Sequence, residues 1–238
     1  MIYTITERQR GLLNTLIKIS RSKKLLGQLT RRDVLQGITV SNFLFFGFGS
    51  TEKWARAGLL PTLRQAEGPF YPIKKPIDQD ADLTFVSTRK KRAQGEICII
   101  RGRVFDVNGK PLSGVLLEIW QANKWGRYQD RRDSIDLPWD HNFQGYGKTR
   151  TDHAGYYTFK TIRPAGYGQG RFRRTPHIHF KVNKRGFNEL ITQMYFAGEP
   201  ENKSDIFFST AERRESILVE FKTIEGGSKL GTFNLILG

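Results

Sequence analysis

Short runs of β-branched and aromatic residues, each bounded by glycine, proline or asparagine, recur from residue 97 to the end of the chain. The clearest run, residues 97–107, ends at Asn108 and Gly109, a pair typical of tight hairpin turns. Further runs predict strands at residues 115–120, 156–161, 177–182, 191–196, 216–223 and 232–237. Many short strands at this spacing are typical of an antiparallel β-sandwich or barrel, and we expect an all-β sandwich with short helices and long loops.

Helical patterns occur in only two places. Residues 11–29 could form a helix near the amino terminus, and residues 207–214 could form a short one. No Ser/Gly linker, low-complexity tract or internal repeat divides the chain after residue 57, so residues 58–238 are expected to form one domain. Hydrophobic residues make up 38% of the sequence and aromatic residues 12%, enough for a packed core, which excludes global disorder.

Residues 1–57 have the layout of a twin-arginine export signal. Arg31 and Arg32 precede the charge-free, weakly polar run 36–51, and Ala55-Arg56-Ala57 has the form of a processing site. We therefore expect export to the periplasm by the twin-arginine route. The alternative is an ordinary amphipathic helix on a cytoplasmic protein. No segment approaches the ~18 consecutive apolar residues of a membrane span, so no integral membrane span is expected.

The chain is strongly basic, with 39 Lys and Arg side chains against 23 Asp and Glu and a net charge of +16. Such a charge suggests a nucleic acid partner, but residues 1–57 alone hold ten basic and three acidic side chains, nearly half of the excess. No RNA-binding signature, zinc-ligand spacing or stripe of basic and stacking aromatic residues accompanies the rest, so no nucleic acid partner is expected. The single cysteine, Cys98, cannot form an intrachain disulfide.

The densest chemistry lies in residues 173–180, Arg-Arg-Thr-Pro-His-Ile-His-Phe. His177 and His179 are two positions apart on a predicted strand, so their side chains project from one face and can approach one metal ion. A pair of histidines is a weak signal alone, because two surface or core histidines would look the same. No carboxylate lies nearby to complete a two-histidine, one-carboxylate iron site. His141 and His153 fall in predicted loops, where they could be solvated.

Tyrosine is the other metal-ligating residue type close to this pair. Tyr167 lies ten residues before His177, between Gly166 and Gly168. Glycine has no Cβ, so the two flanking positions permit the backbone to come close to a metal or ligand.

Separated segments of the chain match one enzyme family in the same order. From about residue 60 onward the sequence resembles the intradiol ring-cleavage dioxygenases, and within them the protocatechuate 3,4-dioxygenase branch. Several segments agree in sequence and spacing, which makes the resemblance specific. The matching segments include EGPFYP at 67–72, RGRV at 101–104, LEIWQAN at 117–123, GRY at 126–128, TD at 151–152, YY at 156–157, RTPHIHF at 174–180 and ITQMYF at 191–196.

The resemblance implies an Fe(III) cofactor held by Tyr128, Tyr167, His177 and His179, each of which has the identity that the family requires. It further implies that Tyr167 and His179 are axial ligands, with Tyr128, His177 and a hydroxide in the equatorial plane. The ligand chemistry agrees, because trivalent iron would lower the phenol pKa from ~10 and two phenolates would neutralise much of its charge. Hard anionic oxygen ligands also favour Fe(III) over Fe(II).

The activity implied by the resemblance is cleavage of a catechol-type ring by O2 between its two hydroxylated carbons, which gives a cis,cis-muconate-type diacid. Tyr167 and the hydroxide would leave and accept the two catechol protons. Arg174 would stabilise electron density that builds up during oxygen attack, and Gln193 would hydrogen-bond near the substrate. Taken alone, these two could equally be a solvated arginine and a polar strand residue.

The resemblance favours a protocatechuate-like substrate, with Gly68, Pro69, Phe70 and Arg174 as binding residues, although the first three could equally form a structural turn. Gln169 stands where protocatechuate enzymes tend to have an aromatic residue, so one wall of the pocket is expected to differ. Three basic residues near the first tyrosine of the set could receive a carboxylate or face solvent: Arg127, Arg131 and Arg132.

Protocatechuate enzymes pair two related chains, so a homo-oligomer or hetero-oligomer is compatible with the family. The alternative from another class is an exported β-sandwich binding domain without turnover. Loss of a tyrosine or histidine ligand would favour that alternative. All four ligands are present, so the enzyme is favoured.

Overall fold

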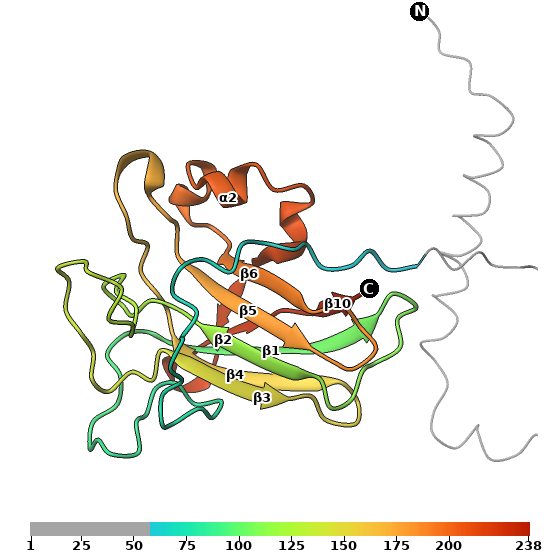
Figure 1. Ribbon diagram of the computed structural model, residues 1–238, viewed down its shortest axis with the longest axis horizontal. Coiled ribbons are helices and arrows are strands. Elements are labelled where there is room, and N and C mark those ends of the chain that lie inside the picture. The colour runs from blue at the N-terminus through green and yellow to red at the C-terminus, as the bar shows by residue number, and fades with distance from the viewer. Residues whose placement is uncertain (1–57) are drawn as a thin grey trace, which may run out of the picture. The chain divides into compact units, whose positions relative to one another are not determined.

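Two five-stranded β-sheets pack face to face in the computed structural model, which describes residues 58–238 (Figure 1). The predicted export leader, residues 1–57, lies outside the described residues. The first sheet contains β1 (Ile97–Asp106), β4 (Tyr156–Ile162), β8 (Phe221–Thr223), β9 (Lys229–Thr232) and β10 (Leu235–Leu237). The second contains β2 (Leu116–Trp120), β3 (Tyr146–Arg150), β5 (His177–Asn183), β6 (Leu190–Phe196) and β7 (Leu218–Val219). The predicted β-sandwich is therefore confirmed.

Helices among residues 58–238 are short, as the sequence predicts there, and the possible helix at 11–29 lies outside the described residues. The described α-helix is α2 (Ile206–Ser209), which begins at the predicted 207–214 helix but ends five residues earlier. Four 3-10 turns accompany it: η1 (Gly170–Phe172), η2 (Pro200–Lys203), η3 (Arg214–Ile217) and η4 (Glu225–Gly227). Within residues 58–238 no helix is long and apolar enough to cross a membrane.

The hydrophobic core lies between the sheets. The inward face of β1 carries the fully buried Cys98, Ile100 and Val104, which alternate with more exposed neighbours as a half-buried strand requires. Phe159 on β4 meets Phe180 on β5 across the layers, with ring centroids 6.3 Å apart. Each such buried side chain contributes about 1.5–3 kcal/mol of transfer free energy. Cys98 is a free thiol, and burial raises its pKa to about 12.

Strand pairing is mixed, because each sheet adds parallel pairs to the antiparallel pairs that the sequence predicted. β4 runs antiparallel to β1, whereas β9 and β10 both run parallel to it. Cys98 pairs with Lys229 and Val104 with Leu235, the same offset, so β9 and β10 continue one another along the same side of β1, with an interruption after Thr232. β7 likewise runs parallel to β6. A pattern of apolar residues marks a strand but does not encode its direction.

Two of the predicted strands are each divided into two shorter strands in the structure. The predicted strand 216–223 supplies β7 to the second sheet and β8 to the first, because the chain crosses between the layers at Glu220. The predicted strand 232–237 is broken at Phe233. The Phe233 carbonyl lies so close to Gly102 that a Cβ on residue 102 would overlap the carbonyl oxygen. That carbonyl accepts a hydrogen bond from the Tyr157 hydroxyl at 2.5 Å.

Strand β3 was missed because its sequence, Tyr-Gly-Lys-Thr-Arg, lacks a run of β-branched residues. Gly147 is required there, since a Cβ would lie 2.5 Å from both the Asp80 carbonyl and a Leu83 methyl group. The preceding segment also accepts a hydrogen bond from the strand, Lys148 N to Gln79 O at 2.8 Å. Tertiary packing of residues 79–83 therefore determines this strand.

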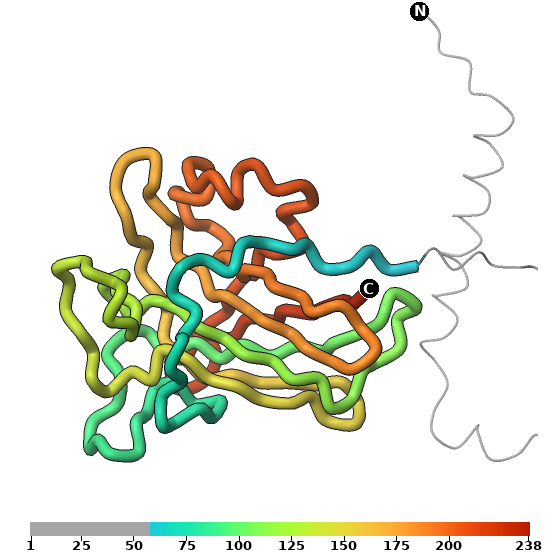
Figure 2. The backbone as a smooth tube through the Cα atoms, in the orientation of Figure 1, coloured from blue at the N-terminus to red at the C-terminus, as the bar shows by residue number. Residues whose placement is uncertain are grey.

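Long loops leave the sandwich at one end. Residues 121–145 join β2 to β3, and residues 163–176 join β4 to β5 (Figure 2). A backbone hydrogen bond from Ala165 N to Asn123 O, 3.1 Å, ties the two loops together. His177 and His179 begin β5 at this same end, so the loops and the histidines meet there.

Candidate metal centre

The two histidines are fixed by the sheet. His177 and His179 lie on β5 between β2 and β6, both buried, with their Nε2 atoms 3.2 Å apart. The Nδ1 atom of His177 lies 2.7 Å from the Thr175 carbonyl. Because a carbonyl oxygen only accepts, Nδ1 carries the proton and Nε2 keeps a free lone pair. His179 is held differently, by the Trp120 indole, which stacks on it with centroids 4.8 Å apart and planes 9° from parallel.

The two tyrosines are fixed by loops. Tyr128 lies in the 121–145 loop, where its backbone N–H donates to the buried Asp133 carboxylate at 2.8 Å. Tyr167 lies in the 163–176 loop and exchanges two backbone hydrogen bonds with Arg174, 3.1 Å and 2.7 Å long. Each tyrosine is therefore held by its own main chain.

Glycines allow the two loops to touch. A Cβ on Gly126 would lie 2.6 Å from the Gly166 carbonyl, and a Cβ on Gly166 would lie 2.5 Å from the Arg174 carbonyl. Gly168, at φ +80°, leaves no room for a side chain against the Phe172 carbonyl. The sequence suggested that Gly166 and Gly168 admit a metal or ligand. In the structure they admit protein backbone.

The four predicted ligands come together between these elements. The Tyr128 hydroxyl lies 3.1 Å from His179 Nε2 and 3.4 Å from His177 Nε2. The Tyr167 ring is nearly perpendicular to that of Tyr128, with centroids 5.4 Å apart, and its centroid is 5.6 Å from that of His177. Two imidazole nitrogens and two phenols thus converge from three separate segments of the chain.

Burial sets the protonation states of this cluster. It raises the pKa of Tyr128 well above its ordinary value, and the neighbouring Tyr167 adds to the effect. It also raises the pKa of Tyr167, against the opposing charge of Arg174. Burial lowers the pKa of His177 to about 3 and that of His179 well below its usual range. Both imidazoles are therefore neutral, the form that binds metal, and a phenolate here requires an adjacent cation.

These residues fit a ferric ion. The two neutral imidazoles offer Nε2 lone pairs, and the two phenols offer oxygens that ionise against a trivalent cation. In the part of the chain from residue 58 onward, no three His, Cys, Asp or Glu side chains are grouped to hold a metal ion. The histidine pair is instead accompanied by tyrosines.

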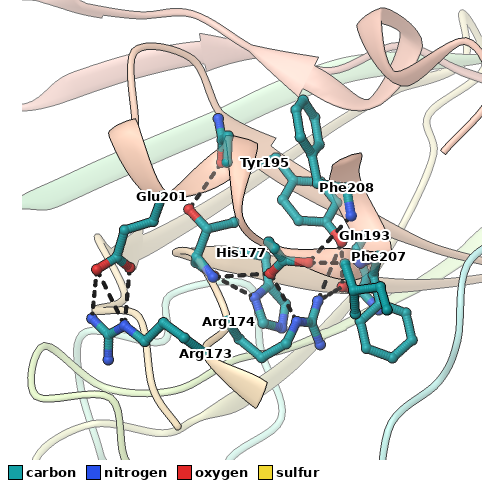
Figure 3. Close-up of polar contacts among 12 residues, drawn as sticks. Arg173, Arg174, His177, Gln193, Tyr195, Glu201, Phe207 and Phe208 are labelled. Carbon is teal, nitrogen blue, oxygen red and sulfur yellow. Dashed lines mark hydrogen bonds and ion pairs between the residues drawn. The ribbon is translucent and has the colours of Figure 1, made fainter. Parts of the chain in front are cut away.

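Arg174 lies three residues before β5, opposite Tyr167 in a backbone bridge and near His177 (Figure 3). Its Nε donates to Asp205 Oδ2 at 2.8 Å, and its Nη2 donates to Gln193 Oε1 at 2.6 Å and to the Tyr195 hydroxyl at 3.2 Å. The Phe207 ring covers the guanidinium, 4.3 Å from its carbon. Within residues 58–238, Nη1 makes no hydrogen bond, so this nitrogen remains able to donate to a ligand.

Comparisons with known proteins identify the family of the chain. A family model described as Dioxygenase matches residues 66–237. The chain is 39% identical over 184 residues to the protocatechuate 3,4-dioxygenase beta chain of Burkholderia cepacia, which covers 74% of this chain and 78% of that protein. The chain belongs to the intradiol ring-cleavage dioxygenase family. It is also 31% identical to catechol 1,2-dioxygenase of Candida albicans, of which it spans 55%.

Solved structures of intradiol dioxygenases share the fold. The dioxygenase domain of a dioxygenase carbohydrate-binding protein fusion from Streptomyces sp. SirexAA-E is 33% identical with a TM-score of 0.56, covering 74% of this chain and 97% of that domain. The 3-chlorocatechol 1,2-dioxygenase of Rhodococcus opacus 1CP is 26% identical with a TM-score of 0.62, covering 77% and 75%.

Gln193 is held by three hydrogen bonds to the protein in this intradiol dioxygenase. Its Oε1 accepts from Arg174 and from the Tyr195 hydroxyl, and its Nε2 donates to the Ala66 carbonyl at 2.8 Å. The side chain is fully buried. Gln193 therefore orients Arg174, while one N–H of its amide group keeps no partner among residues 58–238, and its hydrogen bond to substrate stays a prediction.

The segment Gly68–Pro69–Phe70 borders the cluster. Phe70 stacks on Tyr128 with ring centroids 4.6 Å apart, and Gly68 lies against His179, where a Cβ would be 3.3 Å from Cε1. Gly68 and Pro69 are exposed. Gly68 has a φ of +73°, a turn conformation that favours glycine, and substrate binding by this segment stays a prediction.

The basic residues near Tyr128 are engaged differently. Arg127 donates to the Leu137 carbonyl at 2.6 Å, and Arg132 pairs with Asp130 at 2.6 Å, so both secure the loop. Arg131 is exposed. Two open pockets flank the site, one of about 300 Å³ beside Phe70 and Tyr128, and one of about 330 Å³ beside Phe207.

Several residues of the site were missed from the sequence: Thr175, Tyr195, Asp205 and Trp120. Trp120 had a usable signal, because it ends the predicted strand 115–120, which pairs with β5. Asp205 had only the signal of a helix N-cap, and its pairing with Arg174, 31 residues away, has no local signature. His141 and His153 are exposed, as expected.

Proposed function

We propose that this chain is a non-haem Fe(III) dioxygenase that uses O2 to cleave a catechol-type ring between its two hydroxylated carbons, giving a cis,cis-muconate-type diacid. The observation that carries the proposal is the convergence of two buried tyrosines and two neutral histidines, with Tyr128 Oη within 3.4 Å of both Nε2 atoms. Membership of the intradiol family supports it independently.

Tyr128, Tyr167, His177 and His179 would hold the iron. Bound ferric iron would withdraw electron density from a coordinated catecholate, which makes the ring rather than O2 the activated partner. The chain itself keeps both imidazoles neutral by burial and supplies the phenols from two loops. Trp120 and Thr175 keep the imidazole rings in place.

Tyr167 is the residue that we assign to proton transfer. Tyr128 is fully buried, whereas Tyr167 is half-buried and lies on a loop between two glycines. Its phenolate oxygen would accept one of the two catechol protons, and burial favours that step because it raises the pKa of the phenol. The protonated phenol would then be free to turn away from the cluster.

Arg174 is assigned to charge stabilisation during oxygen attack. Its guanidinium is held by acceptors at Nε and Nη2, while Nη1 has no partner among residues 58–238. A fixed cation in a buried site stabilises developing negative charge without reorganising. Removing one such donor lowers kcat by about 100-fold to 1,000-fold in well-studied enzymes.

A protocatechuate-like substrate is favoured by the 39% identity to a protocatechuate 3,4-dioxygenase beta chain. Relatives named as catechol and hydroxyquinol dioxygenases are 31% identical, so the preference for a particular set of ring substituents is also a proposal. Assembly into a homo-oligomer or hetero-oligomer is likewise proposed from the resemblance, and the mass of the purified protein in solution tests it.

Oxygen uptake and product analysis test the activity. Purified iron-loaded protein is offered protocatechuate, catechol, hydroxyquinol and chlorinated or alkylated catechols. One O2 should be consumed per ring, and mass spectrometry should identify the diacid. A semialdehyde as the main product would contradict intradiol cleavage, and iron-loaded protein inert toward the whole panel would favour a binding domain.

Export through the twin-arginine route is proposed from the sequence alone, from Arg31 and Arg32, the charge-free run 36–51 and the processing site at Ala55-Arg56-Ala57, because residues 1–57 lie outside the described residues. A folded iron site before translocation is consistent with that route. Replacing both arginines with lysine should retain the precursor in the cytoplasm. Normal periplasmic levels of the double variant would show that the segment does not act as a twin-arginine signal, and wild-type protein confined to the cytoplasm would favour the cytoplasmic alternative.

A further inference from the structure

Asp205 is a buried carboxylate that contacts the edge of the Arg174 guanidinium and is fully inaccessible to solvent. Its two oxygens have separate partners. Oδ2 accepts from Arg174 Nε at 2.8 Å and from Thr175 N at 2.9 Å. Oδ1 accepts from the backbone N–H groups of Phe207 and Phe208, at 2.9 and 3.2 Å. One side chain therefore joins the beginning of β5 to the beginning of α2.

The Oδ1 contacts place the aromatic cover of the arginine. Asp205 is the N-cap of α2, and the second residue of that helix is Phe207. The Phe207 ring lies over the Arg174 guanidinium, 4.3 Å from its carbon (Figure 3). Asp205 thus fixes the edge of the guanidinium through Oδ2 and positions the ring over its face through Oδ1.

The Oδ2 contacts connect the arginine to the histidine side of the site. Thr175 N–H donates to Asp205, and the Thr175 carbonyl accepts from His177 Nδ1 at 2.7 Å. The Thr175 hydroxyl donates to the buried Asn202 at 2.9 Å. Asp205 therefore anchors two groups: the Thr175 backbone, which orients His177, and the guanidinium of Arg174.

The neighbouring arginine provides an internal comparison. Arg173 forms an ion pair with Glu201 at 3.0 Å, the same chemistry one residue earlier (Figure 3). Its two side chains are 38% and 37% exposed, whereas those of Arg174 and Asp205 are 10% and 0% exposed. An exposed pair is screened and contributes little, but loss of one partner from a buried pair leaves an uncompensated charge.

We propose that Asp205 is a positioning residue for oxygen attack: it holds Arg174 so that Nη1 is the guanidinium nitrogen presented to the reacting substrate. This inference rests on the proposed dioxygenase function. Gln193 and Tyr195 engage only Nη2, so without Asp205 the guanidinium can rotate about the remaining contacts. Asp205 acts through Arg174 and does not itself touch the substrate.

The variant Asp205→Asn separates the two functions of the carboxylate. Its remaining oxygen can still cap α2, while an NH2 group replaces Oδ2 and faces two donors, Arg174 Nε and Thr175 N. We expect kcat/KM for O2 to fall about 10-fold to 100-fold. The iron content and the anaerobic affinity for catechol should stay within about threefold, because all four metal ligands remain and the Thr175 carbonyl still accepts from His177 Nδ1. Glu201→Gln, the matched control, should change every value by less than about twofold.

A double-mutant cycle distinguishes positioning from general destabilisation. In an Arg174→Ala background, Asp205→Asn should lower kcat/KM for O2 by less than about twofold further, because its route of action is already gone. Asp205→Ser, which caps helices well but has no second oxygen, serves if the Asn variant does not fold, and the same result is expected. An equal loss in both backgrounds, or full O2 reactivity in a folded Asp205 variant, would overturn the positioning role. Wild-type protein without O2 uptake would instead refute the dioxygenase function, and the positioning role with it.

Discussion

The histidines and the tyrosines of the site reach the same point from different kinds of backbone. His177 and His179 lie in the middle of a hydrogen-bonded ladder, where β5 pairs with β2 on one side and β6 on the other. Tyr128 and Tyr167 lie on loops, held by single bridges and by contacts between glycines. We call these the strand half and the loop half of the site.

The difference teaches which ligands are fixed and which can move. A one-residue shift in the register of β5 would move all of its side chains to the opposite face of the sheet, so packing of the core fixes the register of the strand half. The loop half depends on a few close contacts, and such segments open more easily than core strands. A leaving ligand is therefore expected from the loops, which agrees with the assignment of Tyr167 as the departing base.

The largest effect is expected from deletion in the strand half. His179→Ala removes a neutral nitrogen ligand that a fixed strand cannot replace. We expect iron affinity to fall by more than about 100-fold, beyond the effect typical of outer partners of metal ligands. Iron content after dialysis against a chelator measures the loss. Full iron retention would show that His179 is not a ligand.

Deletion in the loop half should separate binding from turnover. Tyr167→Phe leaves three ligands in place but removes the oxygen that accepts a catechol proton. Iron content should remain within about tenfold of wild type, while kcat falls about 100-fold to 10,000-fold, the range of general acid–base contributions. Turnover equal to wild type in the iron-loaded variant would sink the base assignment.

A glycine substitution tests what holds the loop half together. Gly126→Ala places a methyl group 2.6 Å from the Gly166 carbonyl at a φ of +93°, so the tyrosine loops must separate. We expect a loss of about 1–3 kcal/mol in the free energy of unfolding, measured in urea. Gly170→Ala is the matched control, since its φ is +54° but no atom lies within 4 Å. Equal losses would assign the effect to backbone strain alone.

The smallest effect is expected from the aromatic support of the strand half. Trp120→Phe keeps an aromatic ring but reduces the surface stacked on His179, whose Nδ1 has no hydrogen-bond partner among residues 58–238. Iron release to a chelator should accelerate about tenfold, the lower end for residues that orient a ligand. Trp139→Phe, whose ring lies near His141 and not against His179, should leave the release rate unchanged. An unaltered rate in Trp120→Phe would show that the stack is dispensable.

Sequence alone was most informative where function depends on local periodicity. The two-residue spacing of His177 and His179 on a predicted strand required only the alternation of a β-strand, and the structure has that strand. The contacts of Gly126 and the pairing of Arg174 with Asp205 join residues 30 or more positions apart. Their geometry depends on loop conformation and helix position, which no short pattern encodes.

The fold followed the same division. Strands with their own apolar alternation, such as β1, were predicted, whereas β3 depends on packing against residues 79–83 and was missed. The parallel course of β9 and β10 beside β1 arises because the chain crosses between sheets after β7. Strand direction and layer assignment are tertiary properties, and the burial pattern of a segment does not contain them.

The visible absorption spectrum of the iron-loaded protein tests the central claim most directly, because it reports on both halves at once. If Tyr128 and Tyr167 coordinate the same ferric ion as His177 and His179, one iron per chain should give an intense tyrosinate-to-Fe(III) charge-transfer band and a burgundy colour. The band should weaken in Tyr167→Phe and disappear with the iron in His179→Ala. A preparation that carries one ferric ion per chain and is colourless would contradict the account.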